Sequence, residues 1–93
     1  MKLQEILAKP NATVIDVRES FEFFFGHLRG STNIPLGSIP EHVAELKKIN
    51  GPIVLVCRSG NRSGQAAAFL QAKGLKQVYN GGAWQDLKGL QPA

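Results

Sequence analysis

The stretch that decides the fold runs from residue 53 to residue 70 and reads IVLVCRSGNRSGQAAAFL. Its first four residues are apolar and mostly β-branched, which predicts a buried strand that ends at Cys57. The alanine-rich part that follows Ser63 has helical character, so the loop 58–63 must turn at the N-terminus of a helix. A thiol is therefore expected where a strand ends and a helix begins.

Cys57 is the only cysteine of the chain and is the candidate nucleophile. Unpaired N–H groups at a helix start favour negative charge, so a thiolate and an oxyanion brought to it would be stabilised together. The helix dipole contributes about 2 kcal/mol at best, little more than one pKa unit. Loop N–H groups and the charges of Arg58 and Arg62 must therefore contribute if the thiolate is to dominate at neutral pH. The alternative is that Cys57 is a small buried core residue without chemistry.

Helices and strands are expected to alternate along the chain. Helices are predicted at residues 3–7, 19–25, 38–49, 64–73 and 83–88, and strands at 13–17, 53–57 and 77–79. Ser38 and Glu41, three residues apart, predict a capping box at the start of the third helix. The alternation favours an α/β fold with a small, mainly parallel sheet, helices on both of its faces and ligands at the carboxyl ends of its strands.

Four phenylalanines fall in the second predicted helix. Phe21, Phe24 and Phe25 follow the spacing of one helical face, which predicts that they point into the core. Phe23 lies off that face and is expected to be partly exposed.

Composition excludes several classes of function. A chain of 93 residues with 43% hydrophobic content supports one small core, and its single cysteine fits a reducing compartment. We see no signal peptide and no run of transmembrane length, so a cytoplasmic protein is expected. His27 and His42 lack further ligands at metal spacing. The net charge of +4 is not gathered into a basic run interleaved with aromatic residues, so it suits small anions better than nucleic acid.

The segment 57–63 resembles the active-site loop of single-domain rhodaneses, the thiosulfate sulfurtransferases. Two further blocks match this family in order: residues 14–35, which contain VIDVR, EF, GHL, GS and NIP, and residues 78–84, which contain VYNGG and Trp84. The resemblance covers nearly the whole chain and implies one rhodanese-like domain over residues 1–93. Phe24 and Phe25 depart from the family, which more often has small or polar residues there.

The resemblance implies a two-step sulfur transfer. Cys57 attacks the sulfane sulfur of thiosulfate or of a persulfide donor, and the resulting persulfide passes its terminal sulfur to a thiol or cyanide acceptor. Neither a metal nor an organic cofactor is required, and neither nucleic acid nor a membrane is an expected partner.

The resemblance also assigns the residues around the nucleophile. The loop N–H groups would hold the charged terminal sulfur. The two arginine roles follow instead from position: Arg62, at the helix start, would brace loop carbonyls or meet the oxyanion end of the donor, and Arg58, directly after Cys57, would face solvent at the mouth. Asp16 and Arg18 would form a buried polar pair that supports the loop from beneath. The proposed substrate-binding loop thus consists of Arg58, Ser59, Gly60, Asn61, Arg62 and Ser63.

Two other functions compete with this interpretation. Cysteine-dependent phosphatases and arsenate reductases use the same strand, loop and helix, but their loops carry Cys, five residues and then Arg. Here Arg62 follows Cys57 after four residues, and Val56 stands where those phosphatases usually place His. The second alternative is a rhodanese-like module that relays sulfur or regulates by binding. A module that only binds would be expected to lack Cys57 or Gly60, and both are present.

Overall fold

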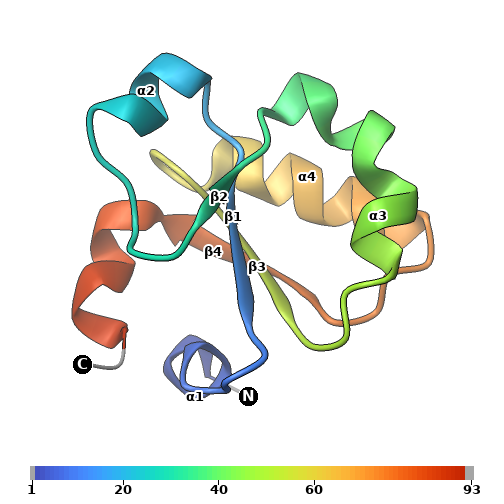
Figure 1. The fold of residues 1–93 in the computed structure, drawn as a ribbon, viewed down its shortest axis with the longest axis horizontal. Coiled ribbons are helices and arrows are strands. Elements are labelled where there is room, and N and C mark those ends of the chain that lie inside the picture. The colour runs from blue at the N-terminus through green and yellow to red at the C-terminus, as the bar shows by residue number, and fades with distance from the viewer. Residues whose placement is uncertain (1, 92–93) are drawn as a thin grey trace.

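The computed structural model describes residues 2–91, which fold around a sheet of four parallel strands (Figure 1). The strands are β1 (Thr13–Asp16), β2 (Thr32–Asn33), β3 (Ile53–Cys57) and β4 (Val78–Ala83). Their order in the sheet is β2-β1-β3-β4, so β3 lies between β1 and β4. Every residue of β3 is buried, as its continuous apolar run predicts.

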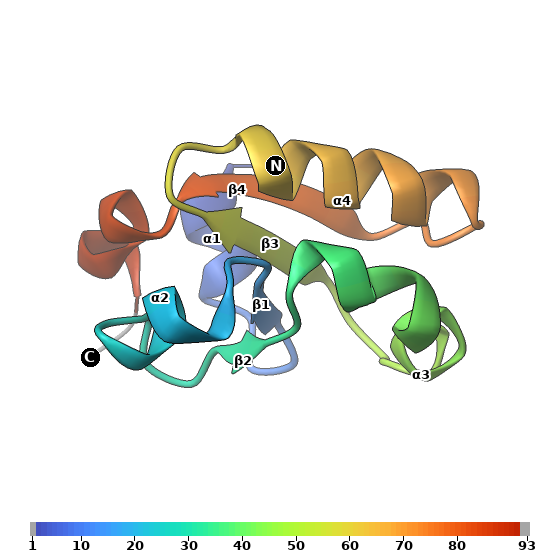
Figure 2. The ribbon, with the colours of Figure 1, turned by 90° about the horizontal axis from the view of Figure 1, so that it is seen from above.

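Helices cover both faces of the sheet (Figure 2). Because side chains alternate along a strand, Leu55 and Cys57 face one side of β3 while Val54 and Val56 face the other. The first side packs against η1 (Leu36–His42), α3 (Val43–Lys47) and α4 (Asn61–Ala72), and the second against α1 (Leu3–Leu7) and η2 (Trp84–Leu90). The predicted α/β architecture with a parallel sheet and two covered faces is confirmed.

The capping box predicted at Ser38 is wrong. The segment becomes helical at Leu36 as a 3-10 helix, and Ser38 lies inside it, with its N–H donating to the Pro35 carbonyl at 2.8 Å. Pro40 has no N–H to contribute to an α-helical ladder, so regular α-helix begins only at Val43. The predicted buried face, with Ile39 and Leu46, is nevertheless present.

The predicted burial of the phenylalanine face is also wrong. Helix α2 spans only Ser20–Phe24, and Phe21, Phe24 and Phe25 are 66%, 80% and 83% exposed. The helix lies beyond the carboxyl ends of the strands rather than on a face of the sheet, so this side of α2 has no core to contact (Figure 1). Phe23 is partly exposed, as predicted, and stacks on the His27 ring, with centroids 3.7 Å apart.

Strand β4 continues beyond the predicted residues 77–79 to Ala83, and it contains a bulge. Leu55 pairs with Asn80 and the next residue, Val56, pairs with Gly82, so Gly81 is the extra residue. A Cβ atom on Gly81 would come within 2.7 Å of Val54 Cγ1 and 2.9 Å of Val56 Cγ1. Both valines are fully buried and belong to the central strand. Glycine at position 81 therefore allows β4 to lie close against β3.

We expect Gly81→Ala to lower the free energy of unfolding by about 1–3 kcal/mol, because the added methyl group overpacks the contact with Val54 and Val56. Urea unfolding followed by circular dichroism measures this. Gly37→Ala is the matched control: nothing lies within 4 Å of a Cβ atom there, so its effect should stay within about 0.5 kcal/mol. Equal stability of the two variants would contradict this account of the bulge.

Candidate active site

The sulfur of Cys57 lies inside the loop that connects β3 to α4. The Gly60 N–H donates to Sγ at 3.0 Å and the Ser63 N–H donates to it at 3.4 Å. Gly60 precedes the helix with a φ of 99°, a left-handed conformation that glycine adopts without a steric penalty. The Cys57 side chain is 0% exposed, whereas Arg58 and Ser59 at the rim of the loop are exposed. The strand, loop and helix expected around Cys57 are therefore present.

The surroundings of Cys57 favour its thiolate. Burial raises the pKa of the Cys57 thiol, but hydrogen bonds from the Ser63 hydroxyl and from the N–H groups of Ser63, Ser59 and Gly60 outweigh it and hold the pKa below its ordinary value. The Ser63 hydroxyl has one proton, and its 2.6 Å bond to Asn80 Oδ1 competes with its 3.4 Å contact to Sγ. The thiolate therefore depends mainly on the backbone N–H groups.

Asn80 is a site residue to which the sequence analysis assigned no role. Its Nδ2 donates to the Gly60 carbonyl at 3.1 Å, and its Oδ1 accepts from the Ser63 hydroxyl and, at 2.9 Å, from the Gly82 N–H. One amide thus ties Gly60 and Ser63 of the loop to β4 beside the bulge. The signal in the sequence was Asn-Gly-Gly at the end of a predicted strand, which is the place where a parallel sheet presents its ligands.

The Arg62 side chain is placed differently from the expectation. Its guanidinium forms a bidentate ion pair with Glu22 of α2, with Nη1 2.7 Å from Oε2 and Nη2 3.0 Å from Oε1. A carboxylate matches the two-pronged guanidinium better than single loop carbonyls do. Hydrogen bonds from Arg62 lower the pKa of Glu22 to about 2, against a smaller opposing effect of burial. Arg58 is exposed at the loop, as expected.

Asp16 and Arg18 form the buried pair that the resemblance implied. Arg18 Nε and Nη2 donate to the Asp16 carboxylate at 2.9 Å and 2.8 Å, and both residues are at most 5% exposed. Arg18 also donates to the Gly26 carbonyl at 2.6 Å, and its guanidinium lies 4.8 Å from the Trp84 ring centroid. Within residues 2–91 the side-chain hydrogen bonds of this pair join the two residues to each other and to the Gly26 carbonyl after α2, and none of them reaches residues 58–63. The pair supports the surroundings of the loop, not the loop itself.

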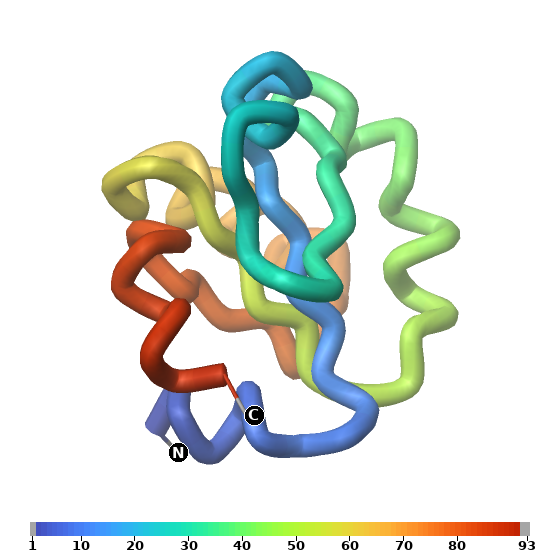
Figure 3. Tube along the Cα trace, turned by 60° about the vertical axis from the view of Figure 1, so that its left-hand side comes forward, coloured from blue at the N-terminus to red at the C-terminus, as the bar shows by residue number. Residues whose placement is uncertain are grey.

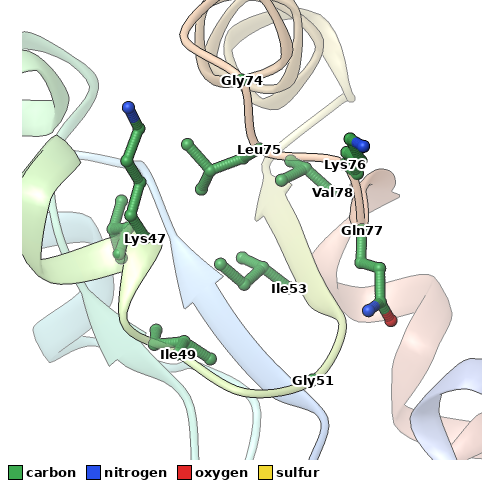
Figure 4. Close-up of a pocket in the computed structure, with 10 residues that line it drawn as sticks. Lys47, Ile49, Gly51, Ile53, Gly74, Leu75, Lys76, Gln77 and Val78 are labelled. Carbon is green, nitrogen blue, oxygen red and sulfur yellow. The ribbon is translucent and has the colours of Figure 1, made fainter.

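A cavity of about 180 Å³ lies elsewhere in the molecule (Figure 4). Its lining includes Ile53 at the start of β3 and Val78 at the start of β4, whereas Cys57 stands at the opposite end of β3. Across residues 2–91, no three His, Cys, Asp or Glu side chains are grouped so that they could hold a metal ion. None of the helices described is long and apolar enough to span a membrane.

Comparison with known proteins identifies the family. The Rhodanese-like domain family matches residues 1–86. The "Putative sulfur carrier protein YrkF" of Bacillus subtilis is 35% identical over 77 residues, which are 83% of this chain and 41% of that protein. The "Thiosulfate sulfurtransferase GlpE" of Pseudomonas aeruginosa is 35% identical over 74 residues, which are 80% of this chain and 66% of that protein. The matched regions thus span about half the length of these relatives.

A solved structure agrees with this. A rhodanese with anions from E. coli superposes with a TM-score of 0.77 and 32% identity, covering 87% of this chain and 94% of that one. The chain therefore belongs to the rhodanese-like domain family. The resemblance read from the loop and its two flanking blocks is confirmed.

A pH titration of the Cys57 thiol tests whether its surroundings stabilise the thiolate. We expect thiolate absorbance near 240 nm to appear at a lower pH than for an unperturbed thiol of pKa ~8.5, because N–H donors stabilise the charged form. Unfolding in urea should return the transition to the ordinary range, and Cys57→Ser should abolish it. Ser59→Ala should leave it in place, since Ser59 contributes only its backbone N–H. A folded-state transition at or above the urea value would contradict the assignment.

The ion pair between Glu22 and Arg62 should appear in the pH dependence of stability. Because the pKa of Glu22 falls from 4.5 to about 2 in the folded protein, its stabilising effect is complete above pH 4.5 and is lost as the pH falls through about 2. Glu22→Gln should therefore cost about 1 kcal/mol at pH 7, as a partly exposed pair does, and progressively less below pH 4.

Urea unfolding of the wild type and of Glu22→Gln between pH 7 and pH 2 measures this difference. Glu41→Gln, which removes an exposed carboxylate on η1, is the matched control and should cost little at any pH. A loss in Glu22→Gln that stays constant down to pH 2 would show that the charge of Glu22 is not what stabilises the fold.

Proposed function

We propose that the chain is a sulfurtransferase that moves a sulfane sulfur through a persulfide on Cys57. The observation that carries the proposal is the convergence of N–H donors from residues 60 and 63 on Sγ, at the start of a helix. Membership of a family that includes thiosulfate sulfurtransferases supports it. We further propose that residues 1–93 form one such domain, and that a reducing, cytoplasmic setting keeps the thiol available.

The first step would be attack of the Cys57 thiolate on the outer sulfur of thiosulfate. A sulfur–sulfur bond forms to Cys57, the bond to the sulfonate sulfur breaks, and sulfite leaves with the electron pair. An acceptor such as cyanide or a thiolate then attacks the terminal sulfur, and Cys57 is released as a thiolate. Each step is a single displacement, and none of them needs an oxidant or a metal.

The loop residues 58–63 would provide the electrostatic part of the catalysis. A persulfide carries its negative charge on the terminal sulfur, and fixed N–H donors around the buried Cys57 sulfur stabilise such a charge without having to reorganise. Since the Arg62 guanidinium is paired with Glu22, exposed Arg58 is the loop arginine available to attract an anionic donor. Asp16 and Arg18 would act as structural support.

The second candidate is sulfur relay, in which the persulfide is passed to another protein rather than used to convert a small molecule. The relative named as a putative sulfur carrier favours it. The chemistry at Cys57 is the same in both cases, so the two candidates differ in the acceptor.

Incubation with thiosulfate should raise the intact mass by one sulfur atom, and cyanide should remove that atom as thiocyanate. Cys57→Ser should show neither event, because the chain has no other thiol. Mass spectrometry and a thiocyanate assay measure these changes, with p-nitrophenyl phosphate as a parallel test for phosphatase activity. A sulfur adduct that persists on Cys57→Ser, or phosphate release that depends on Cys57, would overturn the proposal.

A further inference from the structure

Three phenylalanines of the α2 region form an exposed apolar surface, which we call the α2 patch: Phe21, Phe24 and Phe25, at 66%, 80% and 83% exposure. The Phe24 and Phe25 rings pack edge to face, with centroids 5.4 Å apart. With about 150–250 Å² for a whole aromatic side chain, the patch presents roughly 350–550 Å² of apolar surface. The largest apolar patch of a typical monomer is about 300–600 Å² and is often functional, so the α2 patch is a candidate interaction site.

The α2 patch is held beside the loop of Cys57 by an ion pair. Glu22, which lies in α2 between Phe21 and Phe24, holds Arg62 of α4 through two hydrogen bonds. The N–H of the residue after Arg62 donates to Sγ, so a short series of contacts joins the patch to the sulfur. In Figure 3, α2 and the loop after β3 lie towards the same end of the molecule. A molecule seated on the patch would therefore be next to the mouth of the loop.

The end of α2 is held in place as well. Phe23 stacks on His27, whose Nδ1 lies 2.8 Å from the Phe23 carbonyl, and Arg18 binds the Gly26 carbonyl. The helix is thus fixed at Glu22, at Phe23 and just after its end. A helix whose backbone is fixed before it binds a partner has little backbone freedom left to lose.

We propose that the α2 patch is the docking surface for a small acidic protein that carries the acceptor thiol of the reaction. This inference rests on the proposed function, because it requires a sulfur on Cys57 to be transferred. A cyanide ion or a free small thiol has no surface that could cover three phenylalanines. A protein can cover them and can at the same time bring a thiolate to the loop.

Size and charge argue against a second copy of this chain as the occupant. A stable interface buries about 800 Å² on each partner, which is more than the patch offers, whereas short-lived redox encounters are smaller. Two copies would each carry a net charge of +4 and would repel one another. An acidic partner would instead be attracted. Exposed Arg58 at the rim of the loop would lie close to the acidic surface of a partner seated on the patch.

The transfer in the docked complex balances without a further reagent. The partner's thiolate attacks the terminal sulfur of the Cys57 persulfide, and a sulfur–sulfur bond forms on the partner. The bond between the two sulfurs on Cys57 breaks, and Cys57 leaves as a thiolate. The partner departs with the persulfide.

The test loads the protein with thiosulfate and measures transfer to three acceptors: reduced thioredoxin as the acidic protein thiol, glutathione as the small thiol, and cyanide. We expect the double variant Phe24→Ser/Phe25→Ser to lose about tenfold or more in kcat/KM for thioredoxin, with the other two acceptors changed less than twofold. Phe24→Leu/Phe25→Leu is the matched control and should retain most of the transfer to thioredoxin. The wild-type rate to thioredoxin should fall as salt rises.

Three results would overturn the docking proposal: transfer to thioredoxin that the serine variant leaves unchanged, equal losses for all three acceptors, or wild-type transfer to thioredoxin that is no faster than to glutathione. Analytical ultracentrifugation adds a fourth, because a wild-type dimer that dissociates in the serine variant would assign the patch to a second copy. If no sulfur is transferred to cyanide by the wild type, it is the proposed function that fails. Both phenylalanines are exposed, so the variants should fold, and urea unfolding checks this.

Discussion

The convergence of backbone N–H groups on the Cys57 sulfur is the constraint on which the rest of the site depends. It requires the chain to leave β3, reverse within three residues and enter α4, which Gly60 permits by adopting a left-handed conformation. Asn80 of β4 then holds the turn from outside, and the next residue, Gly81, lets β4 lie close against β3. The pKa of the buried Cys57 thiol is lowered because hydrogen bonds to its sulfur outweigh the effect of the lost solvent.

The parts of the fold that sequence analysis predicted correctly are those with local signals. Consecutive residues encode the apolar run of β3, the alanine-rich helix and the loop between them. The parallel sheet follows from the alternation of strands with helices. The family resemblance added Asp16 and Arg18, which no periodicity indicates.

The features that were missed depend on contacts between distant residues. Helical spacing shows that Phe21, Phe24 and Phe25 share a face, but only the position of α2 beyond the sheet shows that this face meets no core. The Arg62 guanidinium finds its partner 40 residues away in the sequence. The bulge at Gly81 depends on the valines of β3. The late start of α3, by contrast, had a local signal in Pro40 that the capping pattern at Ser38 obscured.

The strand order has a consequence for how this kind of protein can diversify. From β1 the chain crosses towards β2 at one edge of the sheet, and from β3 it crosses towards β4 at the other edge. The two connections therefore diverge between the central strands β1 and β3. One connection carries α2 and the other carries the nucleophile. Their separation is set by topology and not by the residues in either one. The α2 connection meets the helix after the loop at the ion pair of Glu22 with Arg62, so its exposed residues can change without altering the hydrogen bonds to the Cys57 sulfur as long as that pair is kept.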